Sequence, residues 1–470
     1  MKHKLTRRSF VKASALATGV FATAPFNILK AQNAGDKIRC VQIGCGGRGM
    51  SHLKAILNEH IVAIVDVDEK RLGAVEKLLR DNNKSPEGIK KFTDYRKVFD
   101  TIAKDFDAIF IASPNHQHAL PAMIAMQLGK HVFCEKPVCH NIGEARQLRA
   151  MAAKTKVATQ MGNQGHNEDG YRKLCEYIWG GVIGNVTETH SWTNRANGGL
   201  GPRPPQKSAP DGLHWDEWIG PAPYREFHDD LHPHEWHGWY DFGNGSIGNM
   251  GCHVLDGVYW ALKVEHPTSV EAEQMRDGSD ERYPLGSRLR WDIPARGNMP
   301  PVKAYWYEGL NPTAKGQADG MLRVARGENR YFPPLLLELI KQYPDEELTS
   351  GDSGTIYVGD KGIIFTGTYG DRMHIVPWEK MRETPAPPKT LPRPRGVFND
   401  FLDAIRSGSL KTASDFDYGC RLTEFTLLGN LAMYAGVGKK LEWDGPNMRV
   451  KNLPEINRWV KRENRAGWRA

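Results

Sequence analysis

The chain has 470 residues, is 40% hydrophobic and 25% charged, and carries a formal net charge of +8. That length is sufficient for two domains with sizeable hydrophobic cores. Residues 1–30 contain six Lys or Arg and no acidic residue, so the rest of the chain carries only +2 (8 minus 6). Because so small a charge offers no basic stripe for neutralising phosphates, we expect no nucleic-acid partner.

Residues 1–34 have the pattern of an export signal and linker. Arg7 and Arg8 form a twin-arginine pair of the kind used by the Tat route, and an apolar stretch over 13–26 follows. That stretch is short for a helix that spans a bilayer, so we expect a signal peptide of about residues 1–31, a periplasmic protein and no stable membrane span. A short N-terminal membrane anchor is the alternative.

Residues 35–160 alternate strand and helix patterns at short spacing, which is typical of a parallel, doubly wound sheet. The expected strands are 37–43, 61–66, 90–93, 107–112, 131–134 and 157–161. The expected helices are 49–58, 69–81, 94–103, 117–129 and 141–154. Open parallel sheets bind ligands beyond the carboxyl ends of their strands, so functional residues are expected just after each strand.

The turn after the first strand has the glycines of a dinucleotide-binding site. Gly44, Gly46 and Gly49 would permit a tight turn, the approach of a pyrophosphate and close helix–strand packing, respectively. The pyrophosphate would lie at the N-terminus of the next helix. Asp66 ends the second strand 22 residues after Gly44, where a carboxylate binds the ribose hydroxyls and repels a 2′-phosphate. The sequence therefore predicts NAD and disfavours NADP.

Two further strand ends carry polar residues. Lys136 follows the fifth strand, where it would point toward the nicotinamide end of the cofactor. Burial would lower its pKa and let it exchange protons with a substrate hydroxyl, whereas a solvated loop lysine is the ordinary alternative. Asn115 follows the fourth strand and would either meet the nicotinamide ribose or cap the next helix. For the nearby His116 and His118 we favour a structural role.

After residue 161 the pattern changes to an α/β domain with a larger, mostly antiparallel sheet. The order is a helix at 168–180, a strand at 185–194, an irregular stretch rich in Gly, Pro, Trp and His up to 250, a helix at 251–262, strand-like runs at 268–275, 287–293, 302–308, 354–366 and 373–376, and helices at 396–407 and 416–434. Loops as long as the irregular stretch are typically functional in compact domains.

Asn249 and His253 would lie one turn apart on one helix face if that helix begins near Asn249. His253 would then be a general acid or base with a pKa near ~6.5. A structural histidine is the usual case, but the presence of Lys136 favours the catalytic interpretation.

Neither the histidines nor the cysteines predict a metal or disulfide site. Four histidines lie close together at 228, 232, 234 and 237, but Pro233 interrupts them and their spacing matches no zinc pattern. The seven cysteines are odd in number and include no Cys-x-x-Cys, so we expect free thiols.

Taken together, these motifs resemble the Gfo/Idh/MocA oxidoreductases. The resemblance runs from about residue 37 to the end and rests on the Gly44–Gly49 turn with Asp66, Ser-Pro-Asn at 113–115, Glu-Lys-Pro at 135–137, Gly-Asn-Met-Gly-Cys-His at 248–253 and Arg-Ala-Gly-Trp at 465–468. It implies a Rossmann domain at 35–160 followed by a substrate-binding α/β domain at 161–470. The open sheet of the second domain often forms the oligomer interface, so the resemblance also implies a homodimer or homotetramer.

One position departs from the family pattern. Many relatives have aspartate four residues before the histidine, whereas this chain has Asn249. An amide can hold a substrate hydroxyl but cannot take its proton, so the base would be His253 or Lys136.

The resulting expectation is an NAD-dependent oxidoreductase acting on a sugar or related polyol. The predicted catalytic residues are Lys136 and His253. The predicted cofactor-binding residues are Gly44, Gly46, Gly47, Arg48, Gly49, Asp66, Ser113, Pro114, Asn115, His118, Glu135, Lys136 and Gln164. The predicted substrate contacts are Asn163, Trp192, Arg195, Asn249 and His253. The alternatives are a redox-neutral glycosidase that oxidises, eliminates and then reduces, a two-substrate sugar oxidoreductase, and a non-catalytic nucleotide- or sugar-binding protein.

Overall fold

A computed structural model describes residues 37–195, 197–199, 202–309, 332–348 and 351–470. The predicted signal peptide and linker at 1–34 lie outside the described residues. Six parallel strands form the first sheet: β1 (Arg39–Ile43), β2 (His60–Val65), β3 (Lys90–Phe92), β4 (Ala108–Ile111), β5 (His131–Cys134) and β6 (Thr159–Met161). Their order is β3-β2-β1-β4-β5-β6, which confirms the predicted doubly wound sheet.

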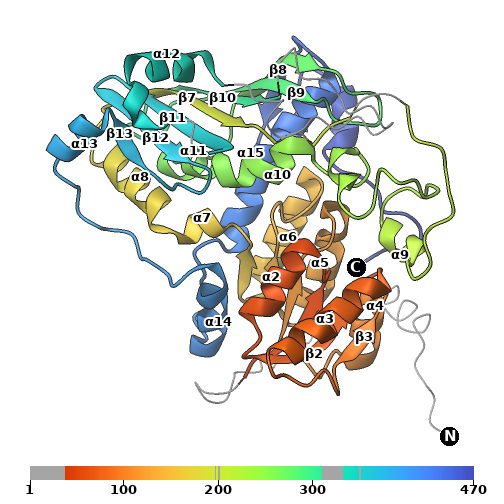
Figure 1. Cartoon of the computed structure of the whole chain (residues 1–470). Helices are drawn as coiled ribbons and strands as arrows, with labels where there is room; N and C mark the ends of the chain where they lie inside the picture. The colour runs from red at the N-terminus through yellow and green to blue at the C-terminus, as the bar shows by residue number, and fades with distance from the viewer. Residues whose placement is uncertain (1–36, 196, 200–201, 310–331, 349–350) are drawn as a thin grey trace, which may run out of the picture.

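Helices cover both faces of this sheet (Figure 1). On one face the sheet packs against α4 (Tyr95–Ile102), α5 (Ala119–Gln127) and α6 (Ile142–Thr155). On the other it packs against α2 (Gly47–Ala55), α3 (Glu69–Asp81) and α14 (Val397–Ser407). Because both faces are covered, the inner strands β4 and β5 are wholly buried, as expected of a parallel sheet, whereas the edge strand β3 is Lys-Lys-Phe and largely exposed.

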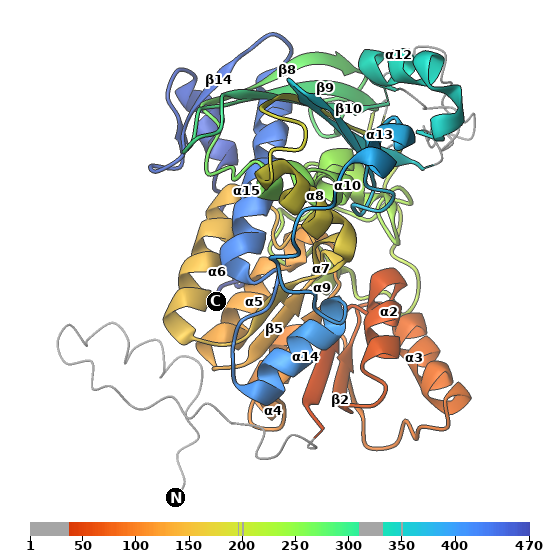
Figure 2. The ribbon, with the colours of Figure 1, turned by 90° about the vertical axis from the view of Figure 1, so that its left-hand side faces the viewer.

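The helix α14 comes from the C-terminal part of the chain but belongs to the N-terminal core. The ring of Phe398 stacks on that of Phe133 with centroids 4.9 Å apart, and Phe401 meets Phe110 edge-on at 5.5 Å. In Figure 2, α14 lies beside the first sheet, far from α13, the helix that precedes it in the chain. The first core is therefore completed only when the distant C-terminal segment has docked.

Nine strands form the second sheet, in the order β13-β12-β11-β7-β10-β9-β8-β14-β15. They are β7 (Val186–Thr193), β8 (Ser269–Arg276), β9 (Gly286–Ile293), β10 (Val302–Glu308), β11 (Ser353–Gly359), β12 (Gly362–Gly367), β13 (His374–Val376), β14 (Leu441–Asp444) and β15 (Arg449–Val450). Every pairing is antiparallel except that of β7 with β10. The predicted mostly antiparallel sheet is confirmed.

Several elements of this half differ from expectation. The run predicted at 354–366 is a hairpin, in which Gly359 pairs with Gly362 at the turn between β11 and β12. The helix predicted at 251–262 is two helices, α10 (Gly245–Val254) and α11 (Asp256–Ala261). Glycines in the first turns of α10 hid its true start, because glycine has a low helix propensity. The remaining helices are α7 (Gln164–Asn167), α8 (Asp169–Trp179), α9 (Trp215–Ile219), α12 (Pro334–Gln342), α13 (Trp378–Glu383) and α15 (Phe416–Ala435). Of these, α7, α9, α12 and α13 are too short or too irregular in pattern to predict from the sequence.

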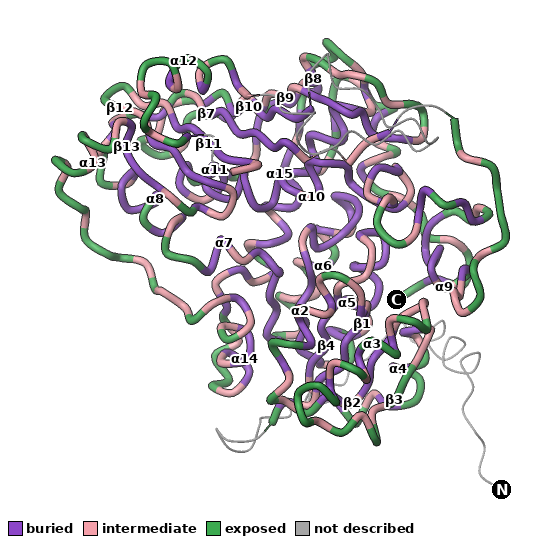
Figure 3. Tube along the Cα trace, viewed as in Figure 1, coloured by how far each residue is buried: buried purple, intermediate pink, exposed green. Residues whose placement is uncertain are grey.

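The long helix α15 joins the two sheets. It packs against α6 and β6 of the first domain and against α10 and β8 of the second. Figure 3 shows α15 and α10 as buried segments that continue the core from one sheet toward the other.

All seven cysteines are buried free thiols, among them Cys420 of α15. Over the described ranges, no helix has the length and apolarity needed to cross a membrane.

Candidate active site

A cavity of about 440 Å³ lies beyond the carboxyl ends of the first sheet. Its size falls within the range of about 300–1,000 Å³ that is usual for small-molecule sites. Residues following β1, β2, β4 and β5 line it, together with α10, the irregular stretch after β7 and the C-terminal Trp468. The predicted site residues that line it are Gly44, Gly46, Gly47, Arg48, Asp66, Ser113, Pro114, Asn115, His118, Glu135, Lys136, Gln164, Arg195, Asn249 and His253.

The glycine turn has the geometry needed for a phosphate group. Gly44 has φ +78°, and a Cβ there would lie 2.7 Å from the backbone of Ala112. At Gly49 a Cβ would lie 1.8 Å from the carbonyl oxygen of Gly44, so only glycine lets α2 pack this close to β1. Gly49 is therefore a packing residue beneath the cavity. Gly46 and Gly47 face the cavity at the N-terminus of α2, which has no side-chain cap, so its N–H groups remain available to an anion.

Asp66 is held in place at the end of β2. Its Oδ2 accepts a hydrogen bond from the N–H of Cys45 at 2.7 Å, and its Oδ1 accepts one from the N–H of Asp68 at 2.9 Å. Burial raises the pKa of this carboxyl, and the two backbone N–H groups oppose that effect. Because a carboxylate oxygen can accept more than one hydrogen bond, both oxygens keep capacity for ribose hydroxyls.

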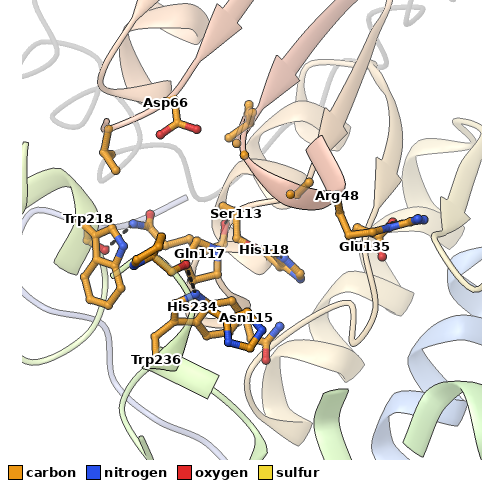
Figure 4. A pocket seen from close by; sticks show the side chains of 18 of the residues that line it. Arg48, Asp66, Ser113, Asn115, Gln117, His118, Glu135, Trp218, His234 and Trp236 are labelled. Atoms are coloured by element: carbon orange, nitrogen blue, oxygen red, sulfur yellow. Dashed lines mark hydrogen bonds and ion pairs between the residues drawn. The ribbon is translucent and has the colours of Figure 1, made fainter. Parts of the chain in front are cut away.

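Glu135 and Arg48 lie side by side on another side of the cavity (Figure 4), and the buried His52 completes an ion-pair cluster with them. Oε1 of the buried Glu135 lies 3.0 Å from Nη2 of Arg48 and 3.0 Å from Nε2 of His52. Burial raises the pKa of Glu135, but hydrogen bonding to His52 and the charges of Arg48 and Lys136 outweigh it, so the pKa falls below its usual range. This cluster fixes the start of α2 against the end of β5.

Lys136 is oriented by Asn249. Its Nζ donates to the carbonyl oxygen of Asn249 at 2.7 Å and to the side-chain Oδ1 of the same residue at 3.1 Å. The amide nitrogen of Asn249 donates to Asn197 at 2.8 Å, which keeps the amide oxygen turned toward the lysine. Burial lowers the pKa of Lys136 to about 8, partly opposed by Glu135. An ammonium group has three protons, so one remains for a ligand.

His253 lies on α10 one turn after Asn249, and its protonation is fixed from behind. Nδ1 of His253 is 2.8 Å from Oδ1 of Asn163. The amide nitrogen of Asn163 already donates to the carbonyl of Cys252 at 2.8 Å and to Asp256 at 3.0 Å, so its oxygen can only accept. Nδ1 therefore carries the proton, and Nε2 is left as an acceptor on the cavity side.

The pKa expected for His253, near 6.5, is wrong. Burial, followed by the positive charge of Lys136, lowers the pKa of this histidine well below that value. The ring is thus neutral at neutral pH, and a neutral imidazole with a free Nε2 can act as a base.

Two of the predicted substrate contacts do not reach the cavity. Asn163 lies behind His253, where Asp256 anchors it; Asp256 also accepts hydrogen bonds from His166 and Tyr418. Trp192 is 1% exposed and packs near Phe365 on the sheet face that α12 covers. Strand alternation does not reveal which face of β7 is covered by a helix, so the sequence could not exclude Trp192.

The structure separates the roles of the residues after β4. Both ring nitrogens of His118 contact backbone carbonyls, those of Pro137 at 2.8 Å and Ser113 at 2.6 Å, so this histidine ties two strand ends together. Asn115 is not a cap. It is the first residue of the 3₁₀ turn η1 (Asn115–Gln117), and Pro114 occupies the cap position without a side-chain hydrogen bond. Oδ1 of Asn115 is buried and finds no hydrogen-bond partner among the described residues, which favours a ligand contact.

Sequence reasoning missed how the irregular stretch covers the cavity. Residues 212–239, here called the strap, fold back over the first domain, where Leu213 bridges to Asp68 and the N–H of His214 donates to Val67 at 2.8 Å. The strap residues that line the cavity are Glu217, Trp218, His232, Pro233, His234, Trp236 and His237. The length of this stretch and its density of Trp and His were the sequence signals. No group of three or more His, Cys, Asp or Glu able to hold a metal ion occurs in the part of the chain described.

Trp468, near the C-terminus, lines the same cavity as the strap. It is 2% exposed, and the guanidinium of Arg96 lies 3.8 Å from its ring centroid. The N–H of Arg465 donates to the carbonyl of Pro221 at 2.9 Å, which joins the C-terminal segment to the strap.

Known families match the sequence of this chain, and solved structures match its fold. Residues 38–163 match the profile described as "Oxidoreductase family, NAD-binding Rossmann fold", and residues 185–282 match "Oxidoreductase family, C-terminal alpha/beta domain". The fold resembles that of the WlbA dehydrogenase from Bordetella pertussis, solved with NADH and UDP-GlcNAcA, with a TM-score of 0.55, 16% identity, and coverage of 87% of this chain and 99% of that chain. At that identity the likeness concerns the fold alone.

Two curated relatives match over parts of their length. Inositol 2-dehydrogenase 3 of Saccharopolyspora erythraea is 28% identical over 158 residues, covering 33% of this chain and 44% of the relative. Glycosyl hydrolase family 109 protein 1 of Shewanella sp. (strain ANA-3) is 29% identical over 192 residues, covering 34% of this chain and 39% of the relative. The chain thus matches less than half the length of either relative.

Proposed function

Because the chain belongs to the Gfo/Idh/MocA oxidoreductase family and has its NAD-binding Rossmann domain, we propose that it transfers hydride between a sugar or polyol carbon and tightly held NAD(H). The observation that carries the proposal is the common cavity. The glycine turn and Asp66 line it together with Lys136, Asn249 and His253, so the groups that would bind the nucleotide and those that would transfer the proton share one space.

The residues present fit the cofactor. Gly46 and Gly47 leave the N-terminus of α2 open to a pyrophosphate, Asp66 offers fixed carboxylate oxygens to a ribose, and the buried Oδ1 of Asn115 lacks a hydrogen-bond partner among the described residues. When bound, NAD supplies the hydride acceptor.

The chain's own groups would manage the proton and the charge. Nε2 of His253 would take the proton of the substrate hydroxyl, since it is the unprotonated nitrogen of a neutral ring. The ammonium of Lys136 would stabilise the negative charge that develops on the substrate oxygen. Asn249 would hold Lys136 in place through its two oxygen atoms.

Enclosure of the cavity supports a retained cofactor. The strap lines it from the second domain, and Trp468 lines it from the C-terminal segment. Export of the folded chain by the predicted Tat signal at 1–34 would carry such a cofactor to the periplasm, where free NAD is scarce. We further propose a homodimer or homotetramer that assembles through the nine-stranded sheet, and a small-molecule carbohydrate as the substrate.

A second candidate is a redox-neutral glycosidase that oxidises a sugar carbon, eliminates the aglycone and returns the hydride. The likeness to a glycosyl hydrolase family 109 protein favours it. A non-catalytic binding protein is disfavoured because the Lys136–Asn249 and His253–Asn163 contacts would serve no purpose there.

The test is to purify the protein without added cofactor, denature it and identify released nucleotide by mass spectrometry. Near-stoichiometric NAD or NADH is the expected result, and assays for sugar–sugar hydride transfer and glycoside cleavage then separate the two candidates. An empty site, with no NADH formed at 340 nm from added NAD and a sugar panel, would refute the proposal. NADP in the site would refute the role of Asp66.

A further inference from the structure

We infer that His237 is a second proton-transfer group, which takes a proton from the substrate carbon next to the one that is oxidised. The inference rests on the proposed hydride transfer, because that proton becomes acidic only when the neighbouring hydroxyl has become a carbonyl. His237 belongs to the strap, so the group comes from outside the lysine–histidine pair at the end of the first sheet.

The ring of His237 is held in one tautomer. It lies in the 3₁₀ turn η2 (Glu235–Gly238), and its Nδ1 is 2.7 Å from the carbonyl oxygen of His234. A carbonyl oxygen can only accept, so Nδ1 carries the proton and Nε2 has a lone pair. The ring of Trp236 stacks on it with centroids 3.6 Å apart and an interplanar angle of 19°. Stacking and hydrogen bond together restrict rotation of the imidazole.

Nε2 of His237 is available to a ligand. The ring lines the cavity with Lys136 and His253, and Nε2 has no hydrogen-bond partner among the described residues. His228, also in the strap, differs because both its nitrogens are sealed in the core. His237 is thus a strap histidine with a restrained ring and an accessible acceptor.

The surroundings keep His237 neutral. Burial, then His234, lower its pKa well below 6.5, and the charge of Lys136 adds to the effect. Lys136 also lowers the pKa of His253. The titratable groups that act on the His237 ring are His234, Lys136 and His118. Glu135 and Arg48, which act on His253, are paired with each other. The lysine is therefore near two neutral imidazoles, each with its proton fixed on Nδ1.

Oxidation of a hydroxyl needs only one base, so the second imidazole has a different task. With the carbonyl formed, Nε2 of His237 takes the proton from the adjacent carbon, and the C–H electron pair moves into a C=C bond. The carbonyl π electrons move to oxygen, and the ammonium of Lys136 stabilises the enolate. If the next carbon carries a glycosidic oxygen, the enolate oxygen re-forms the C=O bond and the C=C electron pair shifts to form a double bond to that next carbon. The C–O bond breaks, its electron pair leaves with the glycosidic oxygen, and this oxygen takes a proton from water. Without such a group, the proton returns to the carbon.

The test is hydrogen exchange in D₂O. The holoenzyme is incubated with the methyl α- and β-glycosides of glucose and galactose and with myo-inositol. NADH formation in a single turnover is read at 340 nm, and deuterium on carbon in the recovered sugar is read by NMR. His237→Gln is compared with His214→Gln, a strap histidine that pairs with Glu69 and does not line the cavity.

The wild type and His214→Gln should place deuterium on the carbon next to the oxidised one. In His237→Gln this exchange should fall by about 100-fold, and by at least about tenfold more than hydride transfer falls. Equal losses of exchange and hydride transfer would show a structural role and overturn the inference. Hydride transfer without exchange in the wild type would overturn it and leave the proposed function standing. No hydride transfer from any probe would overturn both.

Discussion

The side-chain oxygen of Asn163 accepts the Nδ1 proton of His253 across 2.8 Å, and so decides which nitrogen of that ring faces the substrate. Asp256 fixes Asn163 in turn, through a 3.0 Å contact with its amide nitrogen. The tautomer of His253 is therefore set by a residue outside the cavity, which leaves Nε2 as the acceptor.

Replacing Asn163 with alanine should lower kcat by roughly 10- to 100-fold, because the ring loses the acceptor that holds its proton on Nδ1. The nucleotide content of the purified protein should not change, because Asn163 does not line the cavity. Steady-state kinetics and mass spectrometry of bound nucleotide measure the two effects. A loss of nucleotide in parallel with kcat would point to general misfolding.

The rate of sugar oxidation should decline as pH rises through about 8. The pKa of Lys136 is lowered to about 8, so the group is an ammonium below that pH and an uncharged amine above it, where it no longer stabilises the substrate oxygen. Because the pKa of His253 lies well below 6.5, this ring stays unprotonated over the same range. A pH profile of kcat/KM measures the decline.

Replacing Lys136 with alanine should reduce turnover by about 100-fold or more and remove that decline. Lys70→Ala, an exposed lysine at the start of α3, is the matched control. Turnover near that of the wild type would remove Lys136 from the mechanism, whatever the shape of the pH profile.

Asp66→Asn should weaken NAD binding and raise the relative affinity for NADP. The substitution removes the negative charge that repels a 2′-phosphate. Arg71, which also lines the cavity and lies 3.7 Å from Asp68, would remain as a positive charge that attracts the 2′-phosphate. Fluorescence titration of cofactor-stripped protein gives both dissociation constants, and an unchanged NADP-to-NAD ratio would contradict the assignment.

Trp468→Ala should speed the loss of nucleotide during dialysis. The ring is 2% exposed and lines the cavity. Removing a buried tryptophan typically costs about 3–5 kcal/mol of stability, and here the loss would fall on the segment that covers the nucleotide. Trp378→Ala, where the residue is 38% exposed and outside the cavity, is the control and should retain nucleotide like the wild type. Nucleotide per protein chain after timed dialysis is the measurement.

The first domain was predictable because its signals are local. Alternating strands and helices fix a doubly wound sheet, and the glycine turn and Asp66 have spacings that follow from backbone geometry alone. Lys136 was placed correctly at the cavity because strand ends in such a sheet share one edge. Likewise, Asn249 and His253 share a helix face because four residues make about one turn.

What the sequence could not predict depends on tertiary contacts. The strap has no periodicity, so nothing in it indicates that His237 and Trp236 return to the first domain. The pKa of His253 depends on burial and on Lys136, which is more than a hundred residues away in the chain. Trp192 was assigned to the substrate because its strand ends near the site, but α12 covers the face on which it lies.

Because the strap belongs to the second domain and lines a cavity at the edge of the first sheet, ligand binding and domain docking are thermodynamically linked. A ligand that binds only the docked state stabilises that state by mass action. Bound nucleotide would thus stabilise the docked arrangement of the two domains, and its removal would lower the melting temperature of the protein. The holoprotein should therefore melt at a higher temperature than the stripped protein.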